Sequence, residues 1–315
     1  MPYSYQNILK TISLLFILTL SNAAEAGQEY HSAGAFLNLG VDTRALAMGS
    51  AFTSLSTGPE AVYWNPAGLS LCRRVKFSTM ISQLTLDRKH NWASIAYPWD
   101  FVGTLAVGWV GYSVSDIEGR TQNTPDPEWT FSDAQNALML SFGREFVDFF
   151  FAGITAKLLH HNLDGYVGYG AGFDAGFLFA PGRRRLRIGV VFQNLNAQWQ
   201  WQNQHREILP LILRAGASFQ MGKNFIVAAD INHSHVHFHD PRFGIEYRFM
   251  GLFPLRVGFD NNQPTAGLGL KIYAEKANVT FDYALARDSF ELKEMHRLSV
   301  SFELNPKWRP QQTQR

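Results

Sequence analysis

The sequence has few of the features that mark soluble enzymes or helical membrane proteins. Charged residues make up 17% of its 315 residues and the formal net charge is only +2, whereas charged residues usually make up about 25%. A net charge this small gives no reason to expect nucleic acid as a partner. The single cysteine, Cys72, excludes an internal disulfide.

Long apolar runs are also missing, because no segment beyond the N-terminus reaches the roughly 20 apolar residues of a transmembrane helix. Near the N-terminus, Lys10 precedes the apolar run Ile12 to Leu20, and "SNAAEA" follows with an A-x-A pattern. This order predicts a signal peptide over residues 1–26; the alternative, a membrane anchor, would need a longer run. Since only helices and closed β-barrels span a bilayer, the exported chain is either soluble or a β-barrel.

Alternation of apolar and polar residues is abundant from Lys76 onward. In "ANVTFDYAL" Val279, Phe281 and Tyr283 share one face, and Asn278, Thr280 and Asp282 share the other. A period of two with one apolar face indicates a β-strand. About fourteen such segments follow, each close to the length that crosses a bilayer at a tilt: 76–84, 90–98, 101–113, 136–145, 148–160, 166–180, 184–194, 211–221, 224–234, 239–249, 254–260, 264–274, 276–286 and 294–304.

The connections between these segments alternate between short turns and longer loops. The expected long loops include residues 115–135, 197–210 and 286–293. Short turns at one end and long loops at the other are typical of outer-membrane barrels. The sequence therefore predicts an all-β fold, a transmembrane antiparallel barrel over residues 76–304, surrounded by the lipid of a Gram-negative outer membrane. The short turns, with the basic stretch "APGRRRLR" (residues 180–187), would face the periplasm, where this stretch is either a solvated turn or a contact for an acidic partner.

Charged residues of both signs lie on the faces opposite the apolar ones, and these faces would line the lumen. Paired charges can fill a lumen, whereas isolated ones are costly to bury. A packed, salt-bridged interior is therefore favoured over an ion-selective ring. The expected lumenal charges include Arg187, Arg214, Asp230, Glu246, Arg248, Arg256 and Asp282.

The most unusual local motif is "HSHVHFH", which places His233, His235, His237 and His239 at a spacing of two. On a strand all four would share one face, about 6.6 Å apart. The cluster is either a polar external hairpin, the favoured interpretation, or a transition-metal site. No G-x-S-x-G, H-E-x-x-H or nucleotide-loop motif in a strand–helix context is present. We therefore expect no enzymatic activity and no cofactor.

Residues 27–75 do not alternate and are rich in Gly, Ala and Ser. Asp42 or Thr43 is placed to cap a short helix over residues 44–48, and Asn65 with Pro66 marks a turn. A segment this compact before the first strand would fold back into the lumen. We call it the N-terminal plug.

The order "LGVDTRALAMGSAFTSL … AVYWNPAGLS", followed by "VVFQNL", "LRAGASF", "LRVGFD" and "HRLSVSF", resembles the PorV/PorQ family of outer-membrane proteins. These proteins are relatives of the FadL fatty-acid transporters. The resemblance implies a FadL-like barrel of fourteen strands with a small N-terminal hatch inside the lumen. Asn65, Pro66 and Ala67, followed by Gly68, match the hatch motif of that group, and Arg44, Tyr63 and Trp64 are candidate hatch contacts. The polar residues 305–315 form the expected C-terminal tail.

Two functions follow from this resemblance. The leading expectation is a non-enzymatic scaffold or cargo-binding component of type IX protein secretion or surface attachment, with secretion-system or surface proteins as partners. The alternative is a FadL-like channel for the uptake of long-chain fatty acids or other hydrophobic small molecules.

Overall fold

The computed structural model describes residues 33–181, 185–234, 240–261, 263–287 and 294–305, and all statements below concern these residues. The predicted signal peptide, the first residues of the plug (27–32) and the tail from residue 306 onward lie outside them. Within the described ranges, no helix is long and apolar enough to cross a membrane.

The alternating segments form fifteen strands, in agreement with the pleat that sends successive side chains to opposite faces. They are β1 (Lys76–Gln83), β2 (Arg88–Trp99), β3 (Gly103–Gly119), β4 (Trp129–Val147), β5 (Phe150–Leu163), β6 (Tyr166–Phe179), β7 (Leu186–Trp201), β8 (Arg206–Ile208), β9 (Ile212–Met221), β10 (Phe225–Ser234), β11 (Asp240–Phe249), β12 (Phe253–Asp260), β13 (Gln263–Tyr273), β14 (Ala277–Arg287) and β15 (Glu294–Leu304).

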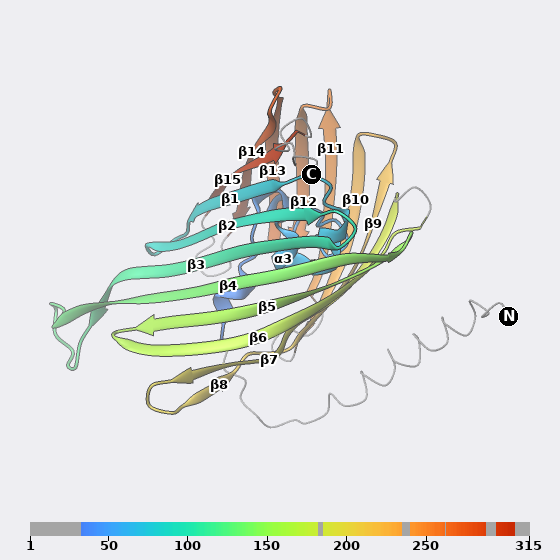
Figure 1. Cartoon of the computed structure of the whole chain (residues 1–315). Coiled ribbons are helices and arrows are strands. Elements are labelled where there is room, and N and C mark those ends of the chain that lie inside the picture. The colour runs from blue at the N-terminus through green and yellow to red at the C-terminus, as the bar shows by residue number, and fades with distance from the viewer. Residues whose placement is uncertain (1–32, 182–184, 235–239, 262, 288–293, 306–315) are drawn as a thin grey trace. The chain divides into compact units, whose positions relative to one another are not determined.

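Fourteen of these strands close into one antiparallel barrel (Figure 1). Each strand pairs with its neighbours along the chain, and β1 also pairs with β15, which closes the ring. Among the described strands, the short β8 pairs only with β7. It forms a hairpin with the end of β7 and is not one of the fourteen strands of the ring. The predicted fold class, a closed FadL-like barrel, is confirmed.

The two faces of the wall differ sharply in exposure. Ile81 and Leu298 on the outer face are 68% and 61% exposed, whereas their neighbours Ser82 and Arg297 on the inner face are buried. The same contrast recurs around the ring, as at Ile245, Leu255 and Val257, whose large apolar side chains point outward. The barrel therefore presents an apolar surface outside and a largely polar surface inside, as a wall in contact with lipid requires.

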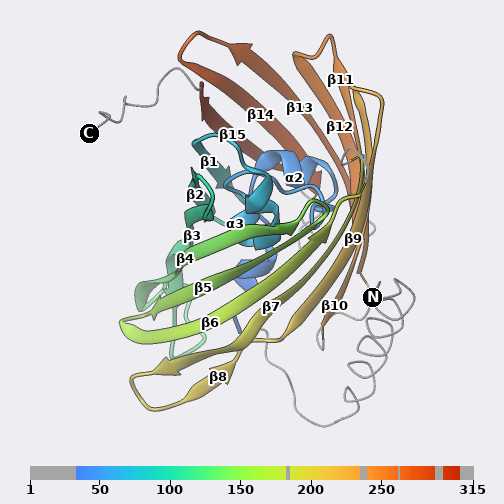
Figure 2. The same cartoon turned by 45° about the vertical axis from the view of Figure 1, so that its right-hand side comes forward.

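The plug lies inside the ring of strands (Figure 2). It contains η1 (Ala35–Asn38), α2 (Thr43–Ala47), α3 (Ala61–Trp64) and η2 (Pro66–Leu71). Asp42 caps α2, because its side chain accepts a hydrogen bond from the Ala45 amide at 3.2 Å. α2 packs against β12 to β15, and η2 packs against β3 to β6. The plug thus contacts opposite sides of the barrel.

Two of the expected long loops are mostly strand, and here the sequence-based prediction is wrong. Residues 115–135 contain the end of β3 and the start of β4, which pair through Ile117 and Phe131. Residues 197–210 contain the end of β7 and all of β8. In both places residues with positive φ, Asp116 and Asn194, interrupt the alternation. A shift of one residue exchanges the two faces of a strand, so the period of two disappears from the sequence.

Candidate functional site

The Asn65-Pro66-Ala67 turn lies against the inner wall, where Asn65 has no exposed surface. The Asn65 Nδ2 group donates to the Thr53 carbonyl at 2.9 Å and to the Phe177 carbonyl of β6 at 3.1 Å. Its Oδ1 atom accepts from the Ala67 amide at 3.1 Å. One side chain therefore fixes the start of η2 and ties it both to the plug and to the wall.

Glycines in the wall make room for this turn. A Cβ atom on Gly176 of β6 would overlap the Asn65 Oδ1 atom and lie 2.9 Å from Pro66 Cδ. A Cβ atom on Gly143 of β4 would lie 2.5 Å from the Pro66 carbonyl oxygen. Because real Cβ contacts are not this short, only glycine lets the backbone of the plug approach the wall so closely.

Tyr63 and Trp64 hold the plug together from its centre. The Tyr63 hydroxyl donates to the Leu37 carbonyl, and Trp64 Nε1 donates to the Val41 carbonyl at 3.0 Å. The guanidinium of Arg214 from β9 lies over both rings, 5.9 Å from the Tyr63 centroid and 5.1 Å from that of Trp64. This cation–π stacking offsets part of the cost of burying Arg214, whose Nε and Nη1 atoms have no hydrogen-bond partner among the described residues.

Arg44 ties α2 to a cluster of charges on the wall. Its Nε and Nη2 atoms donate to the two carboxylate oxygens of Glu246 at 2.7 and 3.2 Å. Arg248 and Arg256 also donate to Glu246, at 2.9 and 2.8 Å, and Arg256 donates to Asp282 at 2.6 Å. The structure therefore brings five of the predicted residues into one salt-bridged network, as a packed interior requires.

Further polar contacts fix the plug to the strands from β10 to β15. Asp230 accepts from the amides of Phe52 and Thr53 at 2.9 and 2.8 Å. Ser50 donates to Asp260 at 2.6 Å, and Arg297 donates to the Leu39 carbonyl at 3.0 Å. Asp230 and Arg297 thus satisfy backbone groups of the plug, whereas Ser50 and Asp260 pair through their side chains.

The strands from β1 to β7 contribute apolar side chains to the contact with the plug. Trp92 of β2 packs with Tyr63, with ring centroids 6.3 Å apart. One buried apolar cluster joins the plug to this part of the wall, and it includes Phe52, Leu55, Val62, Tyr63 and Trp64 from the plug and Met80, Trp92, Val110, Met139, Leu159 and Trp199 from the wall. The interface of the plug is thus polar toward β10 to β15 and largely apolar toward β1 to β4. Toward β5 to β7 it is mixed, because hydrogen bonds of Asn65, Thr155 and Gln193 join plug and wall there.

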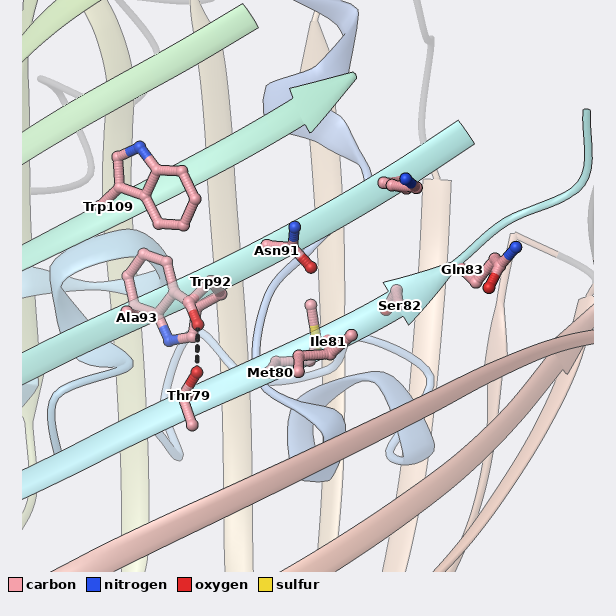
Figure 3. A pocket seen from close by; sticks show the side chains of 10 residues that line it. Thr79, Met80, Ile81, Ser82, Gln83, Asn91, Trp92, Ala93 and Trp109 are labelled. Atoms are coloured by element: carbon pink, nitrogen blue, oxygen red, sulfur yellow. Dashed lines mark hydrogen bonds between the residues drawn. The ribbon is translucent and has the colours of Figure 1, made fainter. Parts of the chain in front are cut away.

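A cavity of about 420 Å³ lies on the wall formed by β1, β2 and β3 (Figure 3). Thr79, Asn91, Ala93 and Trp109 line it, and the Thr79 hydroxyl donates to the Trp92 carbonyl at 3.0 Å. Thr79, Ala93 and Trp109 belong to the outer face of their strands, because the residues that alternate with them are buried. This stretch of the outer wall is therefore hollowed next to Trp92, whose side chain packs against Tyr63 of the plug on the inner face.

Arg187 and the histidines complete the set of predicted residues. Arg187 lies on the inner face at the start of β7. His233 lies near the end of β10, and His235, His237 and His239 are outside the described residues. Within the described ranges no three His, Cys, Asp or Glu residues are close enough to hold a metal ion, and the metal site stays a prediction.

Several residues that hold the plug carry no signal in the sequence. Gln193 donates to the Tyr63 carbonyl at 2.6 Å, and Thr155 donates to the Val62 carbonyl at 3.1 Å. Thr265 accepts from the Gly49 amide at 3.1 Å. Each is an ordinary polar residue on an inner face, so only the closed barrel shows which of them meet the plug.

No protein-family model matches the chain, and no curated protein matches its sequence. Solved structures do match. The toluene transporter TodX of Pseudomonas putida is 14% identical with a TM-score of 0.60, and the match covers 84% of this chain and 98% of TodX. The toluene transporter TbuX of Ralstonia pickettii is 15% identical with a TM-score of 0.57, over 84% and 98% of the two chains.

The monoaromatic hydrocarbon channel CymD is 12% identical with a TM-score of 0.53, over 84% of this chain and 97% of CymD. At such low identity these likenesses establish the fold, a FadL-like antiparallel barrel of fourteen strands. These likenesses do not test the finer resemblance to the PorV/PorQ family, which stays a prediction.

Proposed function

We propose that this chain is an outer-membrane barrel that passes hydrophobic small molecules, such as long-chain fatty acids or hydrocarbons, and that the plug is its hatch. The observation that carries the proposal is the asymmetric interface of the plug, polar toward β10 to β15 and largely apolar toward β1 to β4. The fold likeness to channels named for toluene and other hydrocarbons supports it.

The apolar side of the interface is where a hydrophobic molecule can replace plug contacts at low cost. Separating Tyr63 from Trp92 exposes apolar surface, and an apolar ligand covers that surface again. Separating Arg44 from Glu246 would leave a buried carboxylate with fewer partners, which is far more costly. The plug would therefore shift away from β1 to β4 while its polar contacts with the other strands hold.

A cross-link between plug and wall tests the role of the plug. The Val62 Cγ1 atom of the plug lies 3.0 Å from the position of a Cβ on Gly108 of β3, so the pair Val62→Cys and Gly108→Cys, in a Cys72→Ser background, can form a disulfide on the apolar side of the plug. We expect oxidation to abolish the uptake of labelled oleate and toluene in a host that lacks its own fatty-acid transporter, and reduction to restore it. Equal uptake in both states would show that the plug does not move, and no uptake in either state or in the unmodified chain would refute transport.

The cavity on β1 to β3 provides a second test, since it offers an apolar molecule a place on the outer wall. Ala93→Trp would fill this cavity, whereas Val257→Trp adds a similar side chain to an exposed position on β12. We expect Ala93→Trp alone to lower uptake. If both variants transport equally, the cavity is not on the path.

The secretion scaffold of the PorV/PorQ type remains the second proposal, and the ordered sequence motifs around "AVYWNPAGLS" support it. Deletion of the gene, followed by comparison of the surface and secreted proteomes, tests it. Unchanged secretion, together with lost uptake of hydrophobic molecules, would eliminate the scaffold and retain the channel.

A further inference from the structure

A second cavity, of about 170 Å³, lies where the plug meets the ends of β7, β9 and β11. These strand ends adjoin the short turns, at the end of the barrel that the sequence predicts to be periplasmic. Arg44, Leu55 and Thr57 line it from the plug. Arg185, Arg187, Ser218, Gln220 and Arg248 are among the residues that line it from the wall. Among the described residues, four arginines and no acidic residue therefore line the cavity.

The carboxylate nearest to these arginines already has all its partners. Glu246 accepts four hydrogen bonds, two from Arg44 and one each from Arg248 and Arg256. It carries one negative charge against three guanidinium groups, and Asp282 offsets only one of them, through Arg256.

Three other groups must be counted. Asp42 lies near Arg44, and its side chain accepts a hydrogen bond from the Ala45 amide. Glu60 lies near Arg44, but its side chain accepts hydrogen bonds from the amides of Thr57 and Gly58. Lys271 on β13 adds another positive charge close to Arg44 and Arg248. Six cations thus stand against four acids, and four of the cations line the cavity. The cations are Arg44, Arg185, Arg187, Arg248, Arg256 and Lys271, and the acids are Asp42, Glu60, Glu246 and Asp282.

From this surplus we infer that the cavity is a binding site for a phosphate-type oxyanion. A guanidinium presents a planar fork of N–H donors that matches phosphate oxygens in pairs. Arg44 and Arg248 keep 24% and 25% of their side chains exposed, so each has surface left to meet a ligand beyond its bond to Glu246. Ser218 and Gln220 add a hydroxyl and an amide as further donors.

A bound oxyanion would connect the plug to the wall, because Arg44 and Thr57 belong to the plug and Arg187 and Arg248 belong to the wall. It would also offset the repulsion among the arginines. Occupancy should therefore hold this end of the plug in place and slow its movement.

Titration calorimetry of the detergent-solubilised barrel with inorganic phosphate tests the site. Arg187→Gln and Arg185→Gln each remove one cavity charge and leave the bonds to Glu246 intact, whereas Arg206→Gln makes the same change on β8. We expect saturable binding at one site, weakened about tenfold by either cavity variant because a charge-assisted hydrogen bond is lost. We expect no weakening in Arg206→Gln.

Two further arms complete the experiment. Glycerol 3-phosphate, which has the phosphomonoester of a lipid headgroup, distinguishes a headgroup from free phosphate by whether it binds more tightly. Phosphate should also slow the cleavage of the plug by added protease, and this protection should be weakened in Arg187→Gln. Absence of saturable binding, or equal binding by the cavity variants and the unmodified chain, would overturn the inference whatever the outcome of the uptake experiments.

Discussion

Replacement of Asn65 by alanine should loosen the plug without unfolding the barrel. The change removes the donor to the Thr53 and Phe177 carbonyls and the acceptor for the Ala67 amide, all in a site without solvent exposure. A buried polar group that loses its partner costs about 1–3 kcal/mol. With at least the Thr53 carbonyl and the Ala67 amide affected, we expect the turn to be destabilised by about 2–4 kcal/mol.

Cys72 offers a natural reporter for this change, because it follows η2 directly and is only 2% exposed. Burial raises the pKa of the Cys72 thiol to about 11, and a thiol that stays protonated reacts slowly. Modification by a soluble maleimide at constant pH therefore measures how often the turn opens. Since about 1.4 kcal/mol corresponds to a factor of ten, Asn65→Ala should speed labelling about thirty- to thousandfold.

The control is Asn38→Ala, which changes an exposed residue of the same plug. Its labelling rate should match that of the unmodified chain, and all three barrels should keep the same mobility in unheated electrophoresis samples. Labelling of Asn65→Ala within twofold of the control would refute the argument, because the turn would then be only a connection between plug and strand.

Three further changes probe other parts of the barrel. Gly176→Ala introduces a Cβ that overlaps Asn65 Oδ1, so Cys72 labelling should accelerate; an unchanged rate would mean that the wall yields. Glu246→Gln leaves three guanidinium groups without their carboxylate and should cost about 3–5 kcal/mol, seen as a lower midpoint of thermal unfolding. Glu145→Gln, in an exposed pair, should cost at most about 1 kcal/mol, and similar midpoints would contradict the role of the network. Leu298→Lys places a charge on the exposed outer face and should lower refolding stability in lipid vesicles by about 2–4 kcal/mol; no loss would argue that this face does not meet lipid.

The strands could be predicted from the sequence because a pleated strand imposes its period on every residue. Leu298 and Arg297 already differ in polarity, and the wall separates them as expected. The C-terminal parts of β3 and β7 could not be predicted, because the positive φ angles of Asp116 and Asn194 shift the alternation of apolar and polar residues there. A pattern can only be extended while its register holds.

The plug was predictable in its local parts only. The cap at Asp42 and the turn at Asn65 involve neighbours two or three residues away, and the sequence contains both. The partner of Arg44 lies 202 residues further along the chain. Several carboxylates on inner faces were equally plausible partners, and only the order and stagger of the strands select Glu246.

The position of the plug before β1 has a consequence for the order of folding. Its contacts with Glu246 and Arg297 span 202 and 258 residues, and β1, directly after it, pairs with β15. Contacts this distant in sequence form slowly. The plug, which is made before all of the described strands, is therefore among the last segments to be fixed, and until β15 closes the ring Phe52 and Trp64 lack the complete wall that buries them. During that interval, protection of the plug from aggregation must come from outside the chain.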